Sequence, residues 1–253
     1  MNILAFFSHP DDETIMAGGT LALLARQGAQ VHYLCATRGE GGEAGDPPIC
    51  SRQMLPSVRS DEFSCAVRAL AGASHHFLGF IDPTVGPERE LYPFAEDPVL
   101  VAEPLIAEIQ RLKVDALITH GSGGEYGHPA HRLAHQAAAL AIADLGKNAP
   151  LFYTIQAAFD EHPKPHLINH NDPAHLVLDT SPVLENKLQA TLCYRTQHAL
   201  FVRSASQRAG KPVSIPEIVT AFESLHRAYP PVNGVVDDGL AVLLRGSGCV
   251  IRG

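Results

Sequence analysis

The chain has 253 residues, of which 45% are hydrophobic and 18% charged, and its formal net charge is −8. This length supplies enough apolar surface for a full core, and we expect a single domain over residues 1–253. An acidic chain without any basic run excludes a general nucleic-acid binder, because neutralising phosphates requires clustered Lys and Arg.

The amino-terminal apolar run ends at Ser8 and His9 and has no basic residue before it. It is too short for a signal peptide or a membrane span, so we expect a cytoplasmic protein. The cysteines lie far apart without a CxxC pair, and we expect all of them as reduced thiols. They are Cys35, Cys50, Cys65, Cys193 and Cys249.

The first segments predict a strand and helix unit followed by a second strand. Residues 2–8 are an apolar run suited to a buried strand, and residues 14–28 have a helical pattern that ends at a glycine. A strand is expected over 30–37. A loop rich in Gly and Pro covers 38–51, and a helix is expected over 53–72.

The alternation of strands and helices continues through the middle of the chain. A short strand is expected over 75–78, and residues 82–98 are irregular because they contain four prolines. A helix over 99–112 and a strand over 114–119 follow. After a Gly-rich loop at 121–127, the next elements are again a helix and a strand.

That helix is expected over 131–145 and the strand over 151–157. Beyond residue 159 the pattern weakens to a helix at 181–196 and only short elements after 211. Strands that alternate with helices at such short spacings predict an α/β fold. We expect a mostly parallel sheet with helices on both faces.

The segment His9-Pro-Asp11-Asp12-Glu13 lies where the first strand ends and the first helix begins. Ligands of parallel α/β sheets bind outside the carboxyl ends of the strands. Acids at this place are also explained if Asp11 or Asp12 caps the helix, but capping leaves the histidine unexplained. A histidine and a carboxylate in one turn supply metal ligands, and a second carboxylate can handle a proton.

A second histidine-rich segment, from His120 to His135, lies between a strand and the helix after it. His131 and His135 have the spacing of an HExxH zinc helix, but Arg follows His131, so the base of that motif is missing. We expect His135 to lie outside the metal ligands. The absence of GxxxxGK[ST] excludes a phosphate-binding P-loop, and no GxGxxG follows the first strand.

Four segments together resemble one family: HPDDE at 9–13, GGTLA at 18–22, TRGEGGE at 37–43 and GHPxH at 127–131. The chain is similar to the PIG-L/LmbE-like zinc-dependent N-acetylglucosamine deacetylases. The resemblance implies a Rossmann-like α/β fold without a nucleotide.

This resemblance covers residues 2–197 as a motif-bearing core and leaves 198–253 as carboxyl-terminal elements. Two positions depart from the family pattern. Ala130 stands where Asp is usual, and Tyr194 stands where a histidine is common. Because carboxylates often orient ligating imidazoles, the first departure is expected to loosen the support of His131.

The resemblance implies that His9, Asp12 and His131 bind one zinc ion per chain and that Asp11 is the general base. Three protein ligands leave one position open for water, which is the pattern of catalytic zinc. The metal lowers the pKa of the water towards about 7, and the base accepts its proton during attack on the acetyl carbonyl.

The resemblance also implies that His128 faces the developing oxyanion and helps to protonate the leaving amine, and that Tyr126 adds a second donor. Arg59 and Asp82 resemble positions that hydrogen-bond sugar hydroxyls. Each of these residues also has a plainer interpretation. His128 can be a loop histidine and Tyr126 a packing tyrosine, while Arg59 can form a surface salt bridge and Asp82 can cap a turn.

We therefore expect a zinc-dependent hydrolase that removes the acetyl group from a small N-acetylglucosamine-type substrate. The alternatives are zinc hydrolysis of another amide, such as an acylated amino sugar or an antibiotic intermediate, and a non-catalytic metal- or sugar-binding module. Asp11 and His128 favour catalysis, because binding alone needs neither. We also expect a homo-oligomer, as in many relatives. The motifs leave the aglycone open between inositol, malate, a second sugar and a lipid head group.

Overall fold

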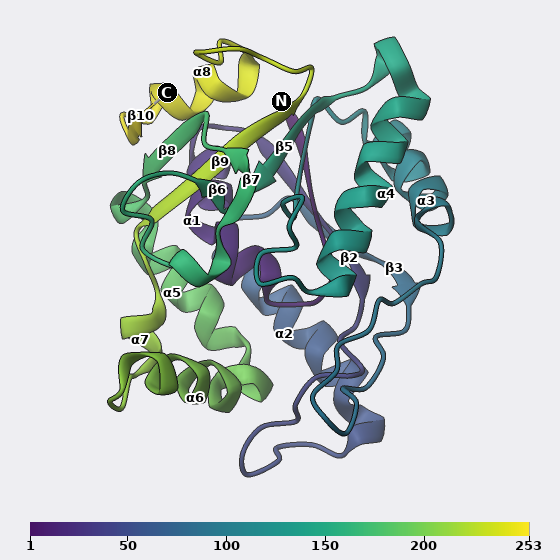
Figure 1. Cartoon of the computed structure of the whole chain (residues 1–253), viewed down its shortest axis with the longest axis vertical. Coiled ribbons are helices and arrows are strands. Elements are labelled where there is room, and N and C mark those ends of the chain that lie inside the picture. The colour runs from purple at the N-terminus through teal and green to yellow at the C-terminus, as the bar shows by residue number, and fades with distance from the viewer. Residues whose placement is uncertain (253) are drawn as a thin grey trace.

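The computed structural model describes residues 1–252 and contains an eight-stranded sheet (Figure 1). In sheet order, its strands are β10 (Val250–Arg252), β8 (Leu176–Asp179), β9 (Phe222–Tyr229), β5 (Leu151–Ile155), β4 (Ala116–Thr119), β1 (Asn2–Phe7), β2 (Gln30–Thr37) and β3 (Ser74–Phe80). All pairings from β5 to β3 are parallel, whereas β9 is antiparallel to β5 and β8, and β10 is antiparallel to β8.

Strand β1 is apolar from Ile3 to Phe7 because both faces of the sheet are covered there. In β1, Ile3, Ala5 and Phe7 pack into one hydrophobic cluster, while Leu4 and Phe6 pack into a second cluster on the other face. Side chains of a strand alternate between the two faces, so apolar residues at successive positions of β1 fill the core on both sides of the sheet.

Helices cover both faces, as the sequence predicts (Figure 1). The first cluster contains side chains of α1 (Asp12–Arg26), α2 (Leu55–Ala69), α5 (Leu184–Cys193) and α8 (Gly239–Gly246), and the second contains those of α3 (Pro98–Leu112) and α4 (Pro129–Leu145). The remaining elements are α6 (His198–Ala209), α7 (Ile215–Ile218) and a small sheet of β6 (Ala157–Ala158) and β7 (Asn169–Pro173). Within residues 1–252, none of the helices combines the length and the hydropathy that a membrane span requires.

The expectation of only short elements after residue 211 is wrong. Strand β9 has eight residues and lies between β5 and β8 inside the sheet. Its buried positions include Glu223, Ser224 and Arg227, whose polar side chains hide the strand pattern in the sequence. These side chains are tolerated because each has a partner in the folded chain.

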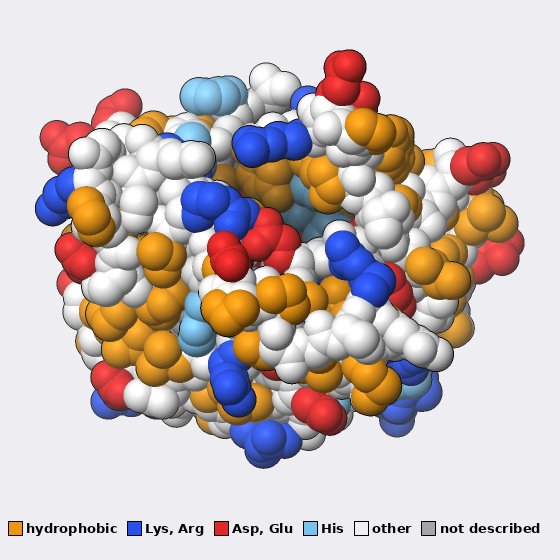
Figure 2. All heavy atoms as spheres, turned by 90° about the horizontal axis from the view of Figure 1, so that it is seen from below, with side chains coloured by type: hydrophobic (Ala, Val, Ile, Leu, Met, Phe, Trp, Pro, Cys, Tyr) orange, Lys and Arg blue, Asp and Glu red, His pale blue; other side chains and the backbone are white. Residues whose placement is uncertain are grey.

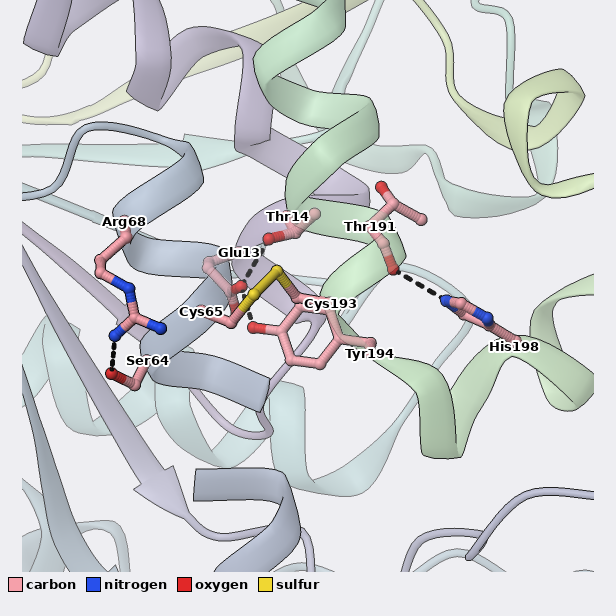
Figure 3. Close-up of a disulfide and its surroundings, with 9 residues drawn as sticks. All are labelled: Glu13, Thr14, Ser64, Cys65, Arg68, Thr191, Cys193, Tyr194 and His198. Carbon is pink, nitrogen blue, oxygen red and sulfur yellow. Dashed lines mark hydrogen bonds between the residues drawn. A yellow bond between two sulfur atoms is a disulfide. The ribbon is translucent and has the colours of Figure 1, made fainter. Parts of the chain in front are cut away.

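The expectation that all five cysteines are reduced is also wrong, because a disulfide joins Cys65 of α2 to Cys193 of α5 (Figure 3). The two Cα atoms lie 5.8 Å apart although 128 positions separate them in the sequence. Cysteine spacing could not indicate this pair, since it depends on the packing of α2 against α5. Cys35, Cys50 and Cys249 are free thiols.

Candidate active site

The two histidine-bearing motifs meet at the carboxyl edge of the sheet because β1 and β4 are parallel neighbours. The HPDDE turn follows β1, and the loop from His120 follows β4. Figure 2 views this edge of the molecule and shows a hollow with histidine side chains inside it and charged side chains near its rim.

The HPDDE turn separates its carboxylates by an unusual backbone conformation. Asp11 stands at the N-cap position of α1 with a φ of 118°, and its side chain makes no capping hydrogen bond. Such a conformation in a non-glycine residue costs about 1–3 kcal/mol and persists only where the surroundings enforce it. The backbone N–H of Asp11 donates to Glu13 Oε2 at 3.1 Å, which anchors the turn. Capping therefore does not explain the acid at position 11.

The three residues expected to bind metal lie together. Asp12 Oδ2 is 3.2 Å from His9 Nδ1, and Asp12 Oδ1 is 3.3 Å from His131 Nε2. All three residues are buried. Asp82, which follows β3, places Oδ1 at 3.2 Å from His9 Nε2 and accepts a hydrogen bond from the backbone N–H of Gly41.

The electrostatics of these residues suit a cation. Burial lowers the pKa of His9, but hydrogen bonds and charges of Asp12 and Asp82 outweigh burial and raise the pKa to about 10. Burial raises the pKa of Asp12, but His131, His120 and His9 hold it well below its usual value. Protons and divalent metals compete for the same nitrogens and carboxylates.

A free nitrogen indicates where a metal ion fits. His131 Nε2 is buried and has no hydrogen-bond partner among residues 1–252, which leaves its lone pair available beside Asp12. The residues could form two ion-binding groups, one of His9, His128 and His131 and one of Asp12, His120 and His131. In His120, however, Nε2 already accepts from the Ser8 N–H at 3.1 Å and Nδ1 contacts Glu125 at 3.0 Å. The first group shares His9 and His131 with the expected set of His9, Asp12 and His131, whose nitrogen and oxygen atoms are typical zinc ligands.

The side chain of Asp11 contacts Arg59. Arg59 Nη2 donates to Asp11 Oδ2 at 2.8 Å, and the guanidinium also donates to the carbonyls of Gly39 and Pro10. Arg59 is only 2% exposed, so its interpretation as a surface salt bridge is wrong. Burial raises the pKa of Asp11 to about 8, although the charge of Arg59 lowers it.

His128 borders the ligand group and caps the next helix. Its Nδ1 accepts from the Ala130 N–H at 3.1 Å, so the neutral ring carries its hydrogen on Nε2. The ring stacks on His131 with centroids 4.4 Å apart. Burial and the charges of His131 and His9 lower the pKa of His128 to about 2. Tyr126 is 54% exposed, and its ring forms a T-shaped pair with the ring of His128, with the centroids 5.6 Å apart.

Sequence reasoning missed Glu125, which lies five residues after His120 and six before His131. Its Oε2 is 3.0 Å from His120 Nδ1 and 2.6 Å from His131 Nδ1. The available signal was an acid within a Gly-rich loop between two histidines. His135 lies outside the ligand group, as expected, with Nδ1 at 3.1 Å from the carbonyl oxygen of His120.

A family model described as GlcNAc-PI de-N-acetylase (PIG-L) matches residues 4–142. A probable N-acetyl-α-D-glucosaminyl L-malate deacetylase 2 from Bacillus cereus is 30% identical over 202 residues, which cover 78% of this chain and 83% of that protein.

Two solved structures share the fold. The N,N'-diacetylchitobiose deacetylase from Pyrococcus horikoshii superposes with a TM-score of 0.61 at 19% identity, covering 89% of this chain and 82% of its own. The 4-carboxy-2-hydroxymuconate hydratase from Pseudomonas putida gives 0.59 at 21% identity, covering 93% of this chain and 99% of its own. A deacetylase and a hydratase on one fold show that the reaction must be argued from the site.

Proposed function

The chain belongs to the PIG-L family of de-N-acetylases, and we propose that it hydrolyses the acetamide of an N-acetylglucosamine-type substrate with one bound zinc ion. The observation that carries this proposal is the division of the HPDDE turn. Asp12 lies among the histidines, whereas Asp11 is held apart on Arg59. A binding module would need only the first group.

We assign His9, Asp12 and His131 to the metal. When bound, a zinc ion supplies Lewis acidity, which makes water a stronger acid and polarises an amide carbonyl. The unpartnered Nε2 of His131 supports this assignment, because a buried imidazole nitrogen is rarely left without a partner.

Asp11 is the proposed general base. Arg59 holds its Oδ2, so the other carboxylate oxygen is available to accept a proton from the attacking water. Burial raises the pKa of Asp11 to about 8, which makes it a stronger base than an exposed aspartate. After the amide carbon becomes tetrahedral, the proton held by Asp11 can pass to the leaving amine.

His128 is proposed to stabilise the oxygen that gains negative charge. The Ala130 N–H occupies Nδ1, so the Nε2–H is the group that can donate to this oxygen. Tyr126 lies beside His128 and is proposed as the second donor. Contacts of Arg59 and Asp82 with sugar hydroxyls stay predictions, as does assembly into a homo-oligomer, which light scattering would measure.

The decisive experiment is acetate release by zinc-loaded protein from N-acetylglucosamine joined to inositol, malate, a second sugar or a lipid head group. We expect turnover of at least one conjugate, slower turnover of longer N-acyl groups, and loss of kcat in His128→Ala with zinc retained. Turnover of an unrelated amide, with no release from any glucosaminide, would instead support the alternative amide hydrolase. A protein that binds zinc and sugar without turning over any amide would be the binding module.

A further inference from the structure

Glu125 is a buried carboxylate whose two oxygens are both fully used. It lies in the loop between β4 and α4, and its side chain is 0% exposed. Oε2 contacts the Nδ1 atoms of His120 and His131, while Oε1 accepts from the Gly121 N–H at 2.9 Å and from Asn169 Nδ2 at 3.1 Å. Burying a carboxylate costs free energy unless such partners surround it. The four hydrogen bonds offset that cost and hold the Glu125 carboxylate in one orientation.

We propose that Glu125 is the positioning residue of the metal centre: one carboxylate oxygen holds the hydrogen-bearing Nδ1 of His131 and of His120, and thereby directs Nε2 of His131 towards Asp12. The inference rests on the proposed function, because it takes His131 as a metal ligand. Carboxylates that bond the second nitrogen of a ligating histidine fix its tautomer and raise its basicity.

The environments of the two Nε2 atoms are consistent with this assignment. An ionised carboxylate only accepts hydrogen bonds, so both rings must carry hydrogen on Nδ1. In His120, Nε2 then has a free lone pair, and the Ser8 N–H points to it at 3.1 Å. In His131, Nε2 is buried and has no hydrogen-bond partner among residues 1–252. The Ser8 N–H therefore fits the tautomer that Glu125 requires in His120, and no hydrogen bond to Nε2 of His131 within these residues requires the other tautomer.

Glu125 also corrects an expectation about Ala130. The absence of Asp at that position was expected to loosen the support of His131. Ala130 is fully buried among apolar side chains and lends His131 no carboxylate, but Glu125, six residues before His131, reaches Nδ1 of that ring at 2.6 Å. The support is therefore present and comes from the preceding loop.

Asn169 of β7 holds this loop in place. Its Oδ1 accepts from the backbone N–H groups of Gly123 and Glu125, both at 3.1 Å, and its Nδ2 donates to the Ile155 carbonyl at 3.0 Å. A Cβ at Gly121 would lie 2.0 Å from Asn169 Cγ, so the loop requires glycine there. The carboxylate of Glu125 is consequently fixed through its own backbone, which pre-organises the site.

The first test needs no variant and no metal. Nitrogen-15 shifts of the histidine rings in metal-free protein report which ring nitrogens carry hydrogen. We expect hydrogen on Nδ1 in both His131 and His120. An Nε2–H tautomer with a bare Nδ1 in either ring would overturn the inference. Because this readout involves neither zinc nor turnover, it tests the hydrogen bonds from the two rings to Glu125 separately from the proposed function.

The second test compares Glu125→Gln and Glu125→Asp with Glu62→Gln, which removes a buried carboxylate bonded to Thr196 elsewhere in the chain. Zinc affinity is measured by competition with a chromogenic chelator, and the Co²⁺ absorption spectrum reports ligand geometry. We expect Glu125→Gln to weaken zinc binding by roughly 10–100-fold and to change the spectrum. The shorter side chain of Glu125→Asp keeps a carboxylate and should recover part of the zinc affinity. Glu62→Gln should leave both the zinc affinity and the Co²⁺ spectrum unchanged.

Circular dichroism and thermal melting verify that each variant is folded. Wild-type zinc affinity together with an unchanged Co²⁺ spectrum in folded Glu125→Gln would overturn the inference. Failure of the wild-type protein itself to bind zinc would instead count against the metal assignment in the proposed function, and the ring tautomers would still show whether Glu125 fixes the hydrogens of the two rings.

Discussion

Adjacent carboxylates in the HPDDE turn take different partners because the backbone bends sharply at Asp11. Its φ of 118° directs the side chain to Arg59, while Asp12 contacts His9 and His131. Two aspartates of identical chemistry can therefore serve as base and as ligand, and substitution should separate the two roles.

We expect Asp11→Asn to keep about one zinc ion per chain and to lower kcat by roughly 10²-fold or more, because only the proton acceptor is lost. Asp12→Asn should lose metal, because it removes the charged oxygen between His9 and His131. Elemental analysis and steady-state kinetics check both. Equal loss of zinc in the two variants would contradict the assignment.

The charge of Arg59 should control the acidic limb of the pH–rate profile. A general base works only when ionised, so kcat/KM falls as the pH drops through the pKa of Asp11. The Arg59 charge lowers that pKa against the effect of burial. In Arg59→Gln the pKa should therefore rise, and the acidic limb should move to higher pH.

Arg68→Gln is the matched control for this shift, since Arg68 lies on the same helix, is exposed and bonds Ser64. Its profile should coincide with that of the wild type. An acidic limb that stays in place or moves to lower pH in folded Arg59→Gln would contradict the role of Arg59.

At the scale of elements, the disulfide joins the two helices that support the HPDDE turn. Cys65 follows Arg59 on α2, and Cys193 precedes Tyr194, whose hydroxyl donates to Glu13 (Figure 3). Arg59 and Glu13 hold Asp11 by its side chain and its backbone, respectively. The bridge thus restrains both supports of the proposed base.

Denatured, non-reduced protein should contain three titratable thiols, and reduction should raise that number to five. We expect reduction to lower the free energy of unfolding by about 2–4 kcal/mol, since it frees a long loop in the unfolded chain. Melting curves with and without reductant measure the loss. The Cys65→Ser variant should melt at the same temperature with and without reductant. A count of five thiols before reduction would contradict the disulfide.

At the scale of the whole molecule, a buried ion pair ties the carboxyl-terminal segment to the motif-bearing helices. Glu223 of β9 accepts from Lys187 Nζ at 2.6 Å and from the backbone N–H groups of Gly19 and Thr20 in α1. The side chains of Lys187 and Glu223 are 1% and 2% exposed. These contacts predict that residues 1–253 unfold as one domain.

Urea denaturation should accordingly show one transition by both circular dichroism and fluorescence. Lys187→Met should destabilise the protein by about 3–5 kcal/mol, because it leaves the Glu223 carboxylate buried without its cation. Arg203→Met, which breaks the more exposed pair with Glu43, should cost less than about 1 kcal/mol. Two separate transitions, or equal losses in the two variants, would contradict this prediction.

Local sequence patterns predict the parallel α/β core and place both histidine-bearing motifs after strands. Alternating apolar runs, helical periodicity and Gly- or Pro-rich loops are local signals, and they identified β1, β2, α3 and the loops after β1 and β4 within a few residues. Even Pro56 lies in the first turn of α2, where its missing N–H costs nothing. The HPDDE motif can be recognised in the sequence because the proposed ligands and the proposed base lie within one turn.

Which distant residues support that turn depends on the tertiary structure. Cys65 meets Cys193, Arg59 meets Asp11, and Glu125 bonds two histidines whose second nitrogens face different partners. Strand β9 joins the sheet because its buried polar groups find partners on other elements. Such contacts depend on packing and register between segments far apart in the chain, and local patterns carry no information about either.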